Sequence, residues 1–340
     1  MHKENVYILG IESSCDDTAA AVLHNGKVLS NIIANQSIHE AYGGVVPELA
    51  SRAHQQNIVP VVDQALKTAG ISKNQLSAVA FTKGPGLMGS LLVGSSFAKS
   101  LAFGLDIPLI EVNHMQAHLL AHFIEDCGDE KPVFPFVGIT ISGGHTQIVL
   151  VKDYFDMEII GETLDDAIGE TFDKCGKTLG LPYPAGPHID KHSKNGDPEK
   201  FKFTKPKVGG LNYSFSGLKT GFMRYIQKEK NIEDDFISKE LENLCASLQL
   251  TIVEILYEKV ILAIKQTGIN RVVFGGGVSC NSGIIEKFKQ NENIENYKSY
   301  FPKFEYTTDN AAMIAMVGYL KYKNNDFSSI EKSAQARFKF

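Results

Sequence analysis

Two histidines four residues apart could carry metal chemistry in this chain. In VNHMQAHLL, residues 112–120, three residues separate His114 from His118. Side chains at positions i and i+4 of an α-helix lie on one face, so both imidazoles could bind the same ion. The residue after the first histidine is Met115, so the HExxH pattern of metalloproteases, whose glutamate is the general base, is absent. A metal site is the chemical interpretation, and a helix with two unrelated histidines is the alternative.

A metal site of this kind needs a third ligand from elsewhere in the chain. Asp309, in TTDNAAMIA, follows a strand-like stretch and precedes a predicted helix. Spacing alone does not select this residue over the other aspartates. Two imidazoles and one carboxylate would leave open coordination positions, as a catalytic ion requires, and they suit both iron and zinc.

Two carboxylates near the N-terminus are candidates for proton transfer. Glu12 and Asp16 lie in GIESSCDDT, residues 10–18, directly after an apolar run. A carboxylate within hydrogen-bonding reach of an amine could remove its proton as a general base. The alternative is that both carboxylates only accept hydrogen bonds from backbone amides of the turn.

Three glycine-bearing turns follow predicted strands: KGPGLMG (83–89), ISGGHT (141–146) and FGGGVSCN (274–281). Glycine lets backbone amides approach an anion closely, and a following helix N-terminus adds positive potential. The first turn has GxGxxG spacing, although Pro85 removes one amide. Any single turn is better explained as a tight connection. The three together favour a phosphate or nucleotide ligand.

Apolar runs alternate with helical patterns along the chain, which predicts an α/β fold. Strands are predicted at 6–11, 78–82, 108–112, 136–141 and 271–276, and helices at 53–70, 90–104 and 241–268. The acidic segment 125–135 contains two prolines and predicts a domain boundary. We therefore expect lobes at 1–131 and 132–340, with a C-terminal helix that can pack back on the first lobe.

The two lobes share a short sequence pattern. GIESSCDDT (10–18) and GITISGGHT (138–146) have Gly, Ile, Ser and Thr at matching places, with an offset of 138 − 10 = 128 residues. Each follows an apolar run and precedes another. Chance is the competing explanation for so short a match, but the pattern predicts an internal duplication.

Composition indicates the environment of the protein. Of 340 residues, 43% are hydrophobic and 21% are charged, and no stretch approaches the roughly 20 apolar residues of a membrane span. Five scattered cysteines without a CxxC pair predict a reducing, cytoplasmic location, and we expect no signal peptide and no membrane. The net charge of −5 gives no overall attraction to nucleic acid, so RNA would need a local patch. Lysines and aromatics interleave at 199–230, which predicts either an RNA surface or a solvated face over core aromatics.

The motifs together resemble the TsaD family of tRNA adenosine threonylcarbamoyltransferases, in its bacterial form. The resemblance rests on nine blocks in family order: GIESSCDDT (10–18), YGGVVPELASRAH (42–54), GPGLMGSLLVG (84–94), VNHMQAH (112–118), SGGHTQIV (142–149), FDKCGKTLGLPYPAGP (172–187), NYSFSGLKT (212–220), GGVSCN (276–281) and TDNAAMIA (308–315). It implies the ASKHA fold, an actin-like and sugar-kinase-like pair of related lobes with a nucleotide-binding cleft. Two positions depart from the commonest pattern, Asn113 and Ala185, and neither bears a role assigned here.

The resemblance also implies a reaction. A threonylcarbamoyl group moves from threonylcarbamoyl-adenylate to the exocyclic amine of the adenosine next to the anticodon on its 3′ side, in tRNAs that read codons beginning with A. The family's metal ligands fall on His114, His118 and Asp309, for one divalent ion per subunit, iron or zinc. The family's substrate contacts fall on these residues: Thr140, Ile141, Ser142, Gly143, Gly144, Asp173, Gly186, Asp190 and Asn281.

The implied partners are tRNA, a TsaB-like paralogue that forms a heterodimer with the chain, and a TsaE-like ATPase. The chain itself would consume no ATP in the transfer step. The predicted helix at 51–69 is the expected partner face, on the family's architecture alone. Three other functions stay open: a metal-dependent endopeptidase, an ASKHA small-molecule kinase and a scaffold without enzymatic activity.

Overall fold

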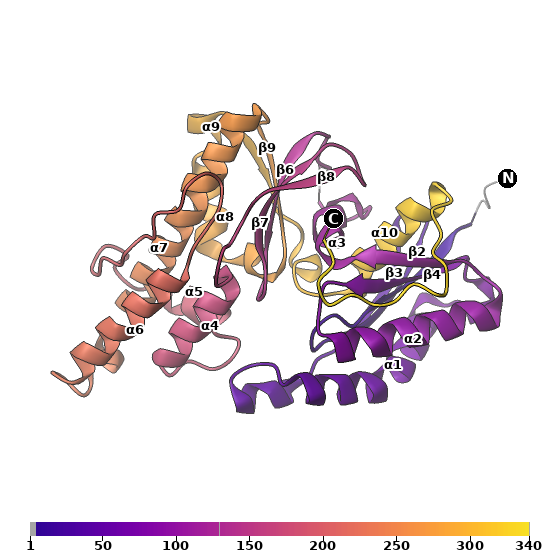
Figure 1. The fold of residues 1–340 in the computed structure, drawn as a ribbon, viewed down its shortest axis with the longest axis horizontal. Coiled ribbons are helices and arrows are strands. Elements are labelled where there is room, and N and C mark those ends of the chain that lie inside the picture. The colour runs from indigo at the N-terminus through magenta and orange to yellow at the C-terminus, as the bar shows by residue number, and fades with distance from the viewer. Residues whose placement is uncertain (1–4, 129, 340) are drawn as a thin grey trace. The chain divides into compact units, whose positions relative to one another are not determined.

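The computed structural model describes residues 5–128 and 130–339. The chain forms two compact units (Figure 1): unit 1 comprises 1–132 with 302–340, and unit 2 comprises 133–301. We expected a second lobe at 132–340 with a C-terminal helix that can pack back on the first lobe; in the structure the segment 302–340 belongs to unit 1. The reason is that its helix, α10 (Ala311–Lys323), packs on the sheet of unit 1.

Each unit is built on a five-stranded mixed sheet. Unit 1 has the order β3-β2-β1-β4-β5 and unit 2 the order β8-β7-β6-β9-β10. The strands of unit 1 are β1 Tyr7–Glu12, β2 Thr18–His24, β3 Lys27–Ala34, β4 Ala78–Gly84 and β5 Leu109–Asn113. Those of unit 2 are β6 Phe136–Ile141, β7 Thr146–Val151, β8 Met157–Glu162, β9 Arg271–Gly275 and β10 Lys298–Tyr300.

The two sheets repeat one topology. In each, the first three strands pair antiparallel, and the first strand also pairs in parallel with the fourth. The fourth and fifth strands pair in parallel in both sheets. The predicted duplication and α/β fold are therefore confirmed, because Gly10 and Gly138 lie on corresponding strands, β1 and β6.

The helices of unit 1 cover both faces of its sheet. They are α1 Pro47–Ala69, α2 Met88–Leu105, α3 His114–Leu120 and α10. Successive side chains of a strand point to opposite faces. Leu9 and Ile11 of β1 pack with the apolar residues of α1 and α2, whereas Gly10 faces α10. The core of unit 1 thus places α10 directly against β1.

Helix α2 is, by length and composition, the one described helix that is long and apolar enough to cross a membrane. Its mean hydropathy is 1.2, and 33% of it is buried. Its buried side contacts α1 and β4. This helix therefore belongs to the packed layer of unit 1 and leaves an apolar outer side.

Unit 2 packs its helices around a large apolar core. They are α4 Ile168–Thr178, α5 Ala185–Ser193, α6 Ser216–Lys230, α7 Phe236–Thr267, α8 Ser282–Gln290 and α9 Glu292–Glu295. The long helix α7 supplies sixteen buried residues and ends at Gly268, which adopts the left-handed conformation with φ 70°. Short 3₁₀ turns complete the two units: η1 Ser37–Tyr42, η2 Lys73–Gln75, η3 Ala121–Phe123, η4 Gly277–Cys280 and η5 Phe304–Tyr306.

Gly10 lets α10 approach the sheet at backbone contact. A Cβ at this position would lie 2.4 Å from the carbonyl oxygen of Ala311 and 2.6 Å from the amide nitrogen of Ala315. Helix backbone cannot move away without breaking the packing of the whole helix. The glycine of the first motif therefore fixes where α10, and the segment before it, lies on β1.

We expect Gly10→Ala to lower the free energy of unfolding by about 1–3 kcal/mol, because the new methyl group overpacks the contact between β1 and α10. Gly104→Ala is the matched control, since its Cβ would meet nothing within 4 Å. It should leave stability unchanged or raise it by up to about 1 kcal/mol, since alanine has the higher helix propensity. Chemical denaturation measures both variants, and equal stabilities would contradict the close approach.

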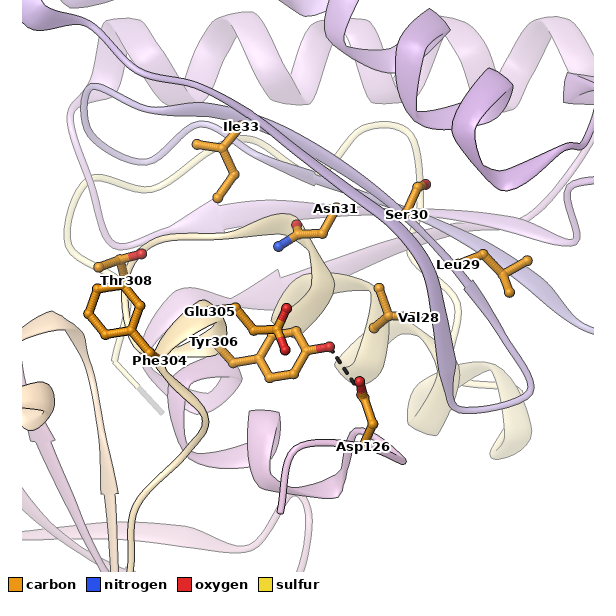
Figure 2. Close-up of a pocket in the computed structure, with 10 residues that line it drawn as sticks. All are labelled: Val28, Leu29, Ser30, Asn31, Ile33, Asp126, Phe304, Glu305, Tyr306 and Thr308. Carbon is orange, nitrogen blue, oxygen red and sulfur yellow. Dashed lines mark hydrogen bonds between the residues drawn. The ribbon is translucent and has the colours of Figure 1, made fainter.

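A surface pocket of about 530 Å³ lies in unit 1 between β3 and the segment 304–308 (Figure 2). Its polar lining includes Asp126, Glu305 and Tyr306, whose hydroxyl donates to Asp126 Oδ1 at 3.1 Å. None of the described residues that line it is a lysine, arginine or histidine. The pocket consequently offers no cationic partner to a phosphate group.

Candidate active site

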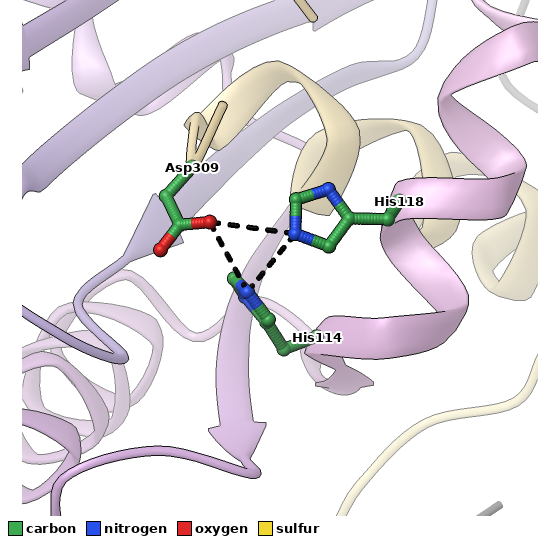
Figure 3. Close-up of side chains that lie close together, drawn as sticks. All are labelled: His114, His118 and Asp309. Atoms are coloured by element: carbon green, nitrogen blue, oxygen red, sulfur yellow. Dashed lines mark hydrogen bonds and ion pairs between the residues drawn. The ribbon is translucent and has the colours of Figure 1, made fainter. Parts of the chain in front are cut away.

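The predicted metal ligands converge in unit 1 (Figure 3). His114 and His118 extend from α3, and Asp309 lies just before α10. The two imidazole Nε2 atoms are 3.2 Å apart, and each is 3.3 Å from Asp309 Oδ1. The ligand atoms of these three side chains thus all lie within 4.8 Å of one another, close enough to share one ion.

The spacing of these three atoms fits a single small cation. With metal–ligand bonds of about 2.0–2.1 Å, two ligands of a tetrahedral site lie about 3.3–3.4 Å apart. The side chain of His118 is fully buried and that of Asp309 is 27% exposed. The donor set is therefore closed on the imidazole side and open beside the carboxylate.

Asn113 starts the helix that carries both histidines. Its side-chain oxygen accepts hydrogen bonds from the amides of Met115 (2.9 Å) and Gln116 (3.2 Å). An asparagine N-cap satisfies amides that would otherwise lack partners at a helix start. The helix thus begins at His114 itself. This capping role was not predicted from the sequence, although the preference of asparagine for N-caps is a signal that could have identified it.

Asp309 is positioned by its neighbour in the TDN motif. The side chain of Asn310 accepts from the amide of Met313 at 3.0 Å and donates to the carbonyl of Thr308 at 2.8 Å. It therefore caps α10 and closes the turn that holds the carboxylate. Because α10 lies against Gly10, the position of Asp309 depends on the packing of the sheet.

Glu12 lies behind His114 at the end of β1. Its Oε2 accepts from His114 Nδ1 at 3.0 Å and from the Thr82 hydroxyl at 2.6 Å. Its Oε1 accepts from the amide of Ser14. With its Nδ1–H donated to the carboxylate, the imidazole presents the lone pair of Nε2 toward Asp309 and His118. Such a carboxylate–histidine pair typically orients a metal ligand.

This geometry argues against Glu12 as the general base. The residue is fully buried, and both of its oxygens accept hydrogen bonds from the protein. Burial alone would raise its pKa, but attraction from His114 outweighs burial and lowers the pKa of Glu12. A carboxylate with a lowered pKa and no open side is a weak proton acceptor for a substrate. The geometry gives Glu12 a positioning role.

The charges around His114 also suit a cation. Burial disfavours the charged imidazole, but attraction from Glu12 and Asp309 outweighs it and raises the pKa of His114. Burial dominates at His118 and lowers its pKa, which keeps that imidazole neutral. The two carboxylates that favour a proton here would equally favour a divalent ion, so the residues present fit a metal.

Asp16 lies in the turn between β1 and β2 and is partly exposed. His54 of α1 fixes this turn, because its Nδ1 lies 2.7 Å from the Thr18 hydroxyl and its Nε2 lies 3.0 Å from the Cys15 carbonyl. Burial raises the pKa of the Cys15 thiol far above its usual range, so the thiol is no nucleophile. Asp16 remains the candidate base of this turn.

The turn KGPGLMG does not cradle a ligand. The amide of Gly86 donates to the Ala336 carbonyl, and that of Leu87 donates to the Ser14 carbonyl. A Cβ at Gly84 would lie 1.9 Å from the Gln335 carbonyl oxygen. The GxGxxG spacing here reflects close packing of protein segments, and the predicted phosphate-binding role of this turn is wrong.

The second glycine turn, in unit 2, is open. A Cβ at Gly143 or Gly144 would meet nothing within 4 Å. The carbonyls of Ser142 and Gly143 accept from the first amides of α4, at Gly169 and Glu170. Thr140 and Ile141 are buried at the end of β6, where the turn starts. Compared with the turn at 83–89, this turn leaves more room for an anion.

The other predicted substrate residues of unit 2 lie at helix N-termini or bind them through hydrogen bonds. Asp173 of α4 accepts from the Ala185 amide at 2.7 Å and from the amide of Gly186. Asp190 of α5 accepts from the amide and the hydroxyl of Ser282 at 3.1 and 2.7 Å. Asn281 caps α8 through the amide of Ile284. The side chains of Asp173, Asp190 and Asn281 thus bind the N-terminal ends of two helices, α5 and α8.

Comparison with known proteins identifies the family. Residues 27–316 match the TsaD family, tRNA N6-adenosine threonylcarbamoyltransferase. Proteins of that name from Christiangramia forsetii and Riemerella anatipestifer are 63% and 58% identical to the chain. The first covers 100% of both chains and the second 97% of both. The chain belongs to the TsaD family. It is therefore a transferase enzyme.

Solved structures place the TsaD chain in the ASKHA fold. The structure of HypF from T. kodakarensis has a TM-score of 0.61 and 15% sequence identity to the chain. The match covers 94% of this chain and 48% of the HypF chain. The structure of ROK hexokinase from Thermus thermophilus has a TM-score of 0.50 and 15% sequence identity. The match covers 94% of this chain and 100% of the hexokinase chain. Identities this low show the fold alone, and the fold predicted from the sequence is confirmed.

Two lysines of the basic segment 199–230 of this TsaD protein are paired with glutamates of α7. Lys200 pairs with Glu240 at 2.7 Å, and Lys205 pairs with Glu254 and Glu258, both at 2.8 Å. The aromatic residues of the segment lie in or against the core of unit 2: Phe201, Phe203, Tyr213, Phe215 and Phe222. Of the two alternatives, these contacts favour a solvated face over core aromatics.

Proposed function

We propose that this chain transfers a threonylcarbamoyl group from threonylcarbamoyl-adenylate to the exocyclic amine of the adenosine 3′-adjacent to the anticodon. The substrates are tRNAs that read codons beginning with A. The single observation that carries the proposal is the convergence of His114, His118 and Asp309 in a chain whose residues 27–316 match the TsaD family. The chain consumes no ATP in this step.

The same three side chains would hold one divalent ion per subunit, iron or zinc. A bound ion would supply a Lewis acid to polarise a carbonyl or phosphoryl oxygen. Glu12 keeps His114 in the tautomer that offers Nε2, and Asn310 holds Asp309 in place. The protein thereby supplies a fixed donor set, so little reorganisation is needed when the substrate enters.

Residues of unit 2 would bind the adenylate. The space beside Gly143 and Gly144, where a Cβ would meet nothing within 4 Å, suits its phosphate, since backbone N–H groups of a glycine turn can stabilise an anion. The free sides of Asp173 and Asp190 would accept ribose hydroxyls, beside Gly186 and Asn281. Thr140, Ile141 and Ser142 would line the same ligand from the end of β6. This set supports the substrate side of the proposal.

We assign proton removal from the adenosine amine to Asp16 rather than to Glu12. Asp16 is partly exposed in the first turn of unit 1, whereas Glu12 is fully enclosed. The remaining rate enhancement would come from holding the amine and the carbonyl in attack geometry, which is worth several powers of ten.

Helices α1 and α2 carry exposed apolar side chains. Val59, Leu92 and Phe103 are exposed there by 60%, 50% and 79%. We propose that this face binds a TsaB-like paralogue and that a TsaE-like ATPase acts with the pair. We expect Leu92→Glu with Phe103→Glu to weaken the heterodimer at least tenfold, since two charges would be buried in an apolar contact. Sedimentation of the mixed subunits measures this, and unchanged association would exclude the face.

The five cysteines are free thiols in the structure. Their state supports the proposal that the protein works in the reducing cytoplasm.

Reconstitution tests the proposed function. The chain and its partners are incubated with unmodified tRNA, threonine, bicarbonate, ATP and an adenylate-forming enzyme, and the nucleosides are analysed by mass. The expected product is threonylcarbamoyladenosine, absent when the chain is omitted. Two other results would overturn this proposal if the nucleosides stay unmodified. Metal-dependent cleavage of a peptide by the chain would indicate an endopeptidase, and phosphorylation of a small molecule would indicate a kinase.

A further inference from the structure

The C-terminal segment runs back over the strand ends that lead to the metal ligands. Ser328 accepts from the Glu111 amide and donates its own amide to the Leu109 carbonyl, both at 2.8 Å, along the free edge of β5. Farther on, the Gln335 amide donates to the Lys83 carbonyl at 2.8 Å. In Figure 1 this yellow segment ends at the C mark, beside α3. The segment thus runs along the edge of β5 and binds the end of β4.

The end of this segment contacts the cap of the metal-bearing helix. The side-chain amide of Asn113 donates to the Phe338 carbonyl at 3.3 Å, while its oxygen caps α3. One asparagine therefore ties the C-terminus to the helix start at His114. Without the bond to Phe338, the Asn113 side chain would be free to rotate away from the cap.

Phe338 is itself anchored to a buried ion pair. Its ring lies 4.6 Å from Lys83 Nζ, which pairs with Glu111 Oε1 at 2.9 Å. The Lys83 side chain is only 6% exposed, and a cation stacked on an aromatic ring gains most where water is excluded. A Cβ at Gly84 would lie 3.2 Å from Phe338 Cβ, so glycine is needed for this approach.

We propose that residues 334–338 form a strap that positions the metal-bearing helix. The strap acts through Asn113. The bond from Phe338 holds the Asn113 side chain in its capping position, and the cap fixes the first turn of α3. That turn directs His114 Nε2 toward the other two ligands, His118 and Asp309. Phe338 and Asn113 are positioning residues, since neither is a ligand. The inference rests on the proposed metal site and extends it to a segment that carries no ligand.

Two truncations of the full chain test the strap by Zn²⁺ affinity, measured by competition with a chromophoric chelator. A chain ending at Arg337 lacks Phe338, and a chain ending at Lys339 keeps it, so the two share a similar new terminus. We expect the shorter chain to bind Zn²⁺ about 10–100-fold more weakly than the longer one, as for other groups that orient a ligand. Its melting temperature should fall by no more than about 4 °C.

Asn113→Ser separates positioning from general stability. Serine can still cap α3 but cannot reach Phe338 with a donor. In this background the same truncation should change Zn²⁺ affinity by less than about threefold, because the link is already broken. An equal loss in both backgrounds, or equal affinity of the two truncated chains, would overturn the strap. If the shorter chain does not fold, Phe338→Ala in the full chain takes its place. It removes the ring that anchors the segment on Lys83 but keeps the carbonyl that Asn113 binds, so Zn²⁺ affinity should fall in the same direction but by less than in the truncation.

The full-length chain distinguishes the two proposals. If it binds one Zn²⁺ tightly and the truncation has no effect, only the strap fails. If the full-length chain binds no Zn²⁺, the proposed metal site fails, and the strap falls with it.

Discussion

Replacing His118 with alanine is expected to abolish metal binding and to lower the rate of tRNA modification at least about a hundredfold. The estimate is a lower bound, because losing a group that merely orients a ligand already costs 10–100-fold. His118 is fully buried, and its Nε2 lies 3.2 Å from His114 Nε2 and 3.3 Å from Asp309 Oδ1. Alanine would leave only two donors for the ion.

His122→Ala is the matched control. It is also buried, lies four residues farther along in the 3₁₀ turn η3, and is outside the ligand group. A loss of packing at either histidine would lower stability, but only the ligand should control the metal content. Metal analysis of the purified variants, with nucleoside analysis of the tRNA, makes the comparison. Metal-free His122→Ala protein, or fully loaded His118→Ala protein, would contradict the assigned ligands.

Local periodicity predicted part of this site, and tertiary packing supplied the rest. The four-residue spacing of His114 and His118 places both on one face of any helix, so their joint orientation followed from the sequence. Asp309 lies far along the chain, and only the packing of α10 on Gly10 brings it to the histidines. No spacing rule encodes such a contact, and family resemblance was needed to select this aspartate.

The role of the glycines at 84 and 86 could not be predicted from the sequence for a related reason. Gly84 and Gly86 match a nucleotide-binding pattern, but in the structure they make room for the Gln335 carbonyl and for Ser14. Close approach to a ligand and close approach to another protein segment require the same small residue. The lysines of 199–230 were ambiguous in the same way, because their acidic partners, such as Glu240 and Glu254, belong to a different helix, α7.

Glu12→Gln is expected to weaken metal affinity about 10–100-fold while the protein stays folded. The carboxylate faces donors on both sides: Ser14 at one oxygen, and Thr82 and His114 at the other. A glutamine has one oxygen and one NH₂ group, so either orientation sets an N–H donor against another donor. With the NH₂ group toward His114, the imidazole would lose the acceptor that fixes its tautomer. Titration of the metal-free protein with Zn²⁺ measures the change.

Thr82→Val provides the control for this prediction, since it removes one donor and keeps the carboxylate on His114. Its metal affinity should change by less than about threefold, because valine matches the shape of threonine and the pair between Glu12 and His114 at 3.0 Å remains. The kinetics of the Glu12→Gln variant distinguish a positioning role of Glu12 from a role as general base. A positioning residue lowers metal affinity, and saturating metal restores much of the rate. A general base would lower kcat at every metal concentration and leave the affinity unchanged, and that result would return the catalytic role to Glu12.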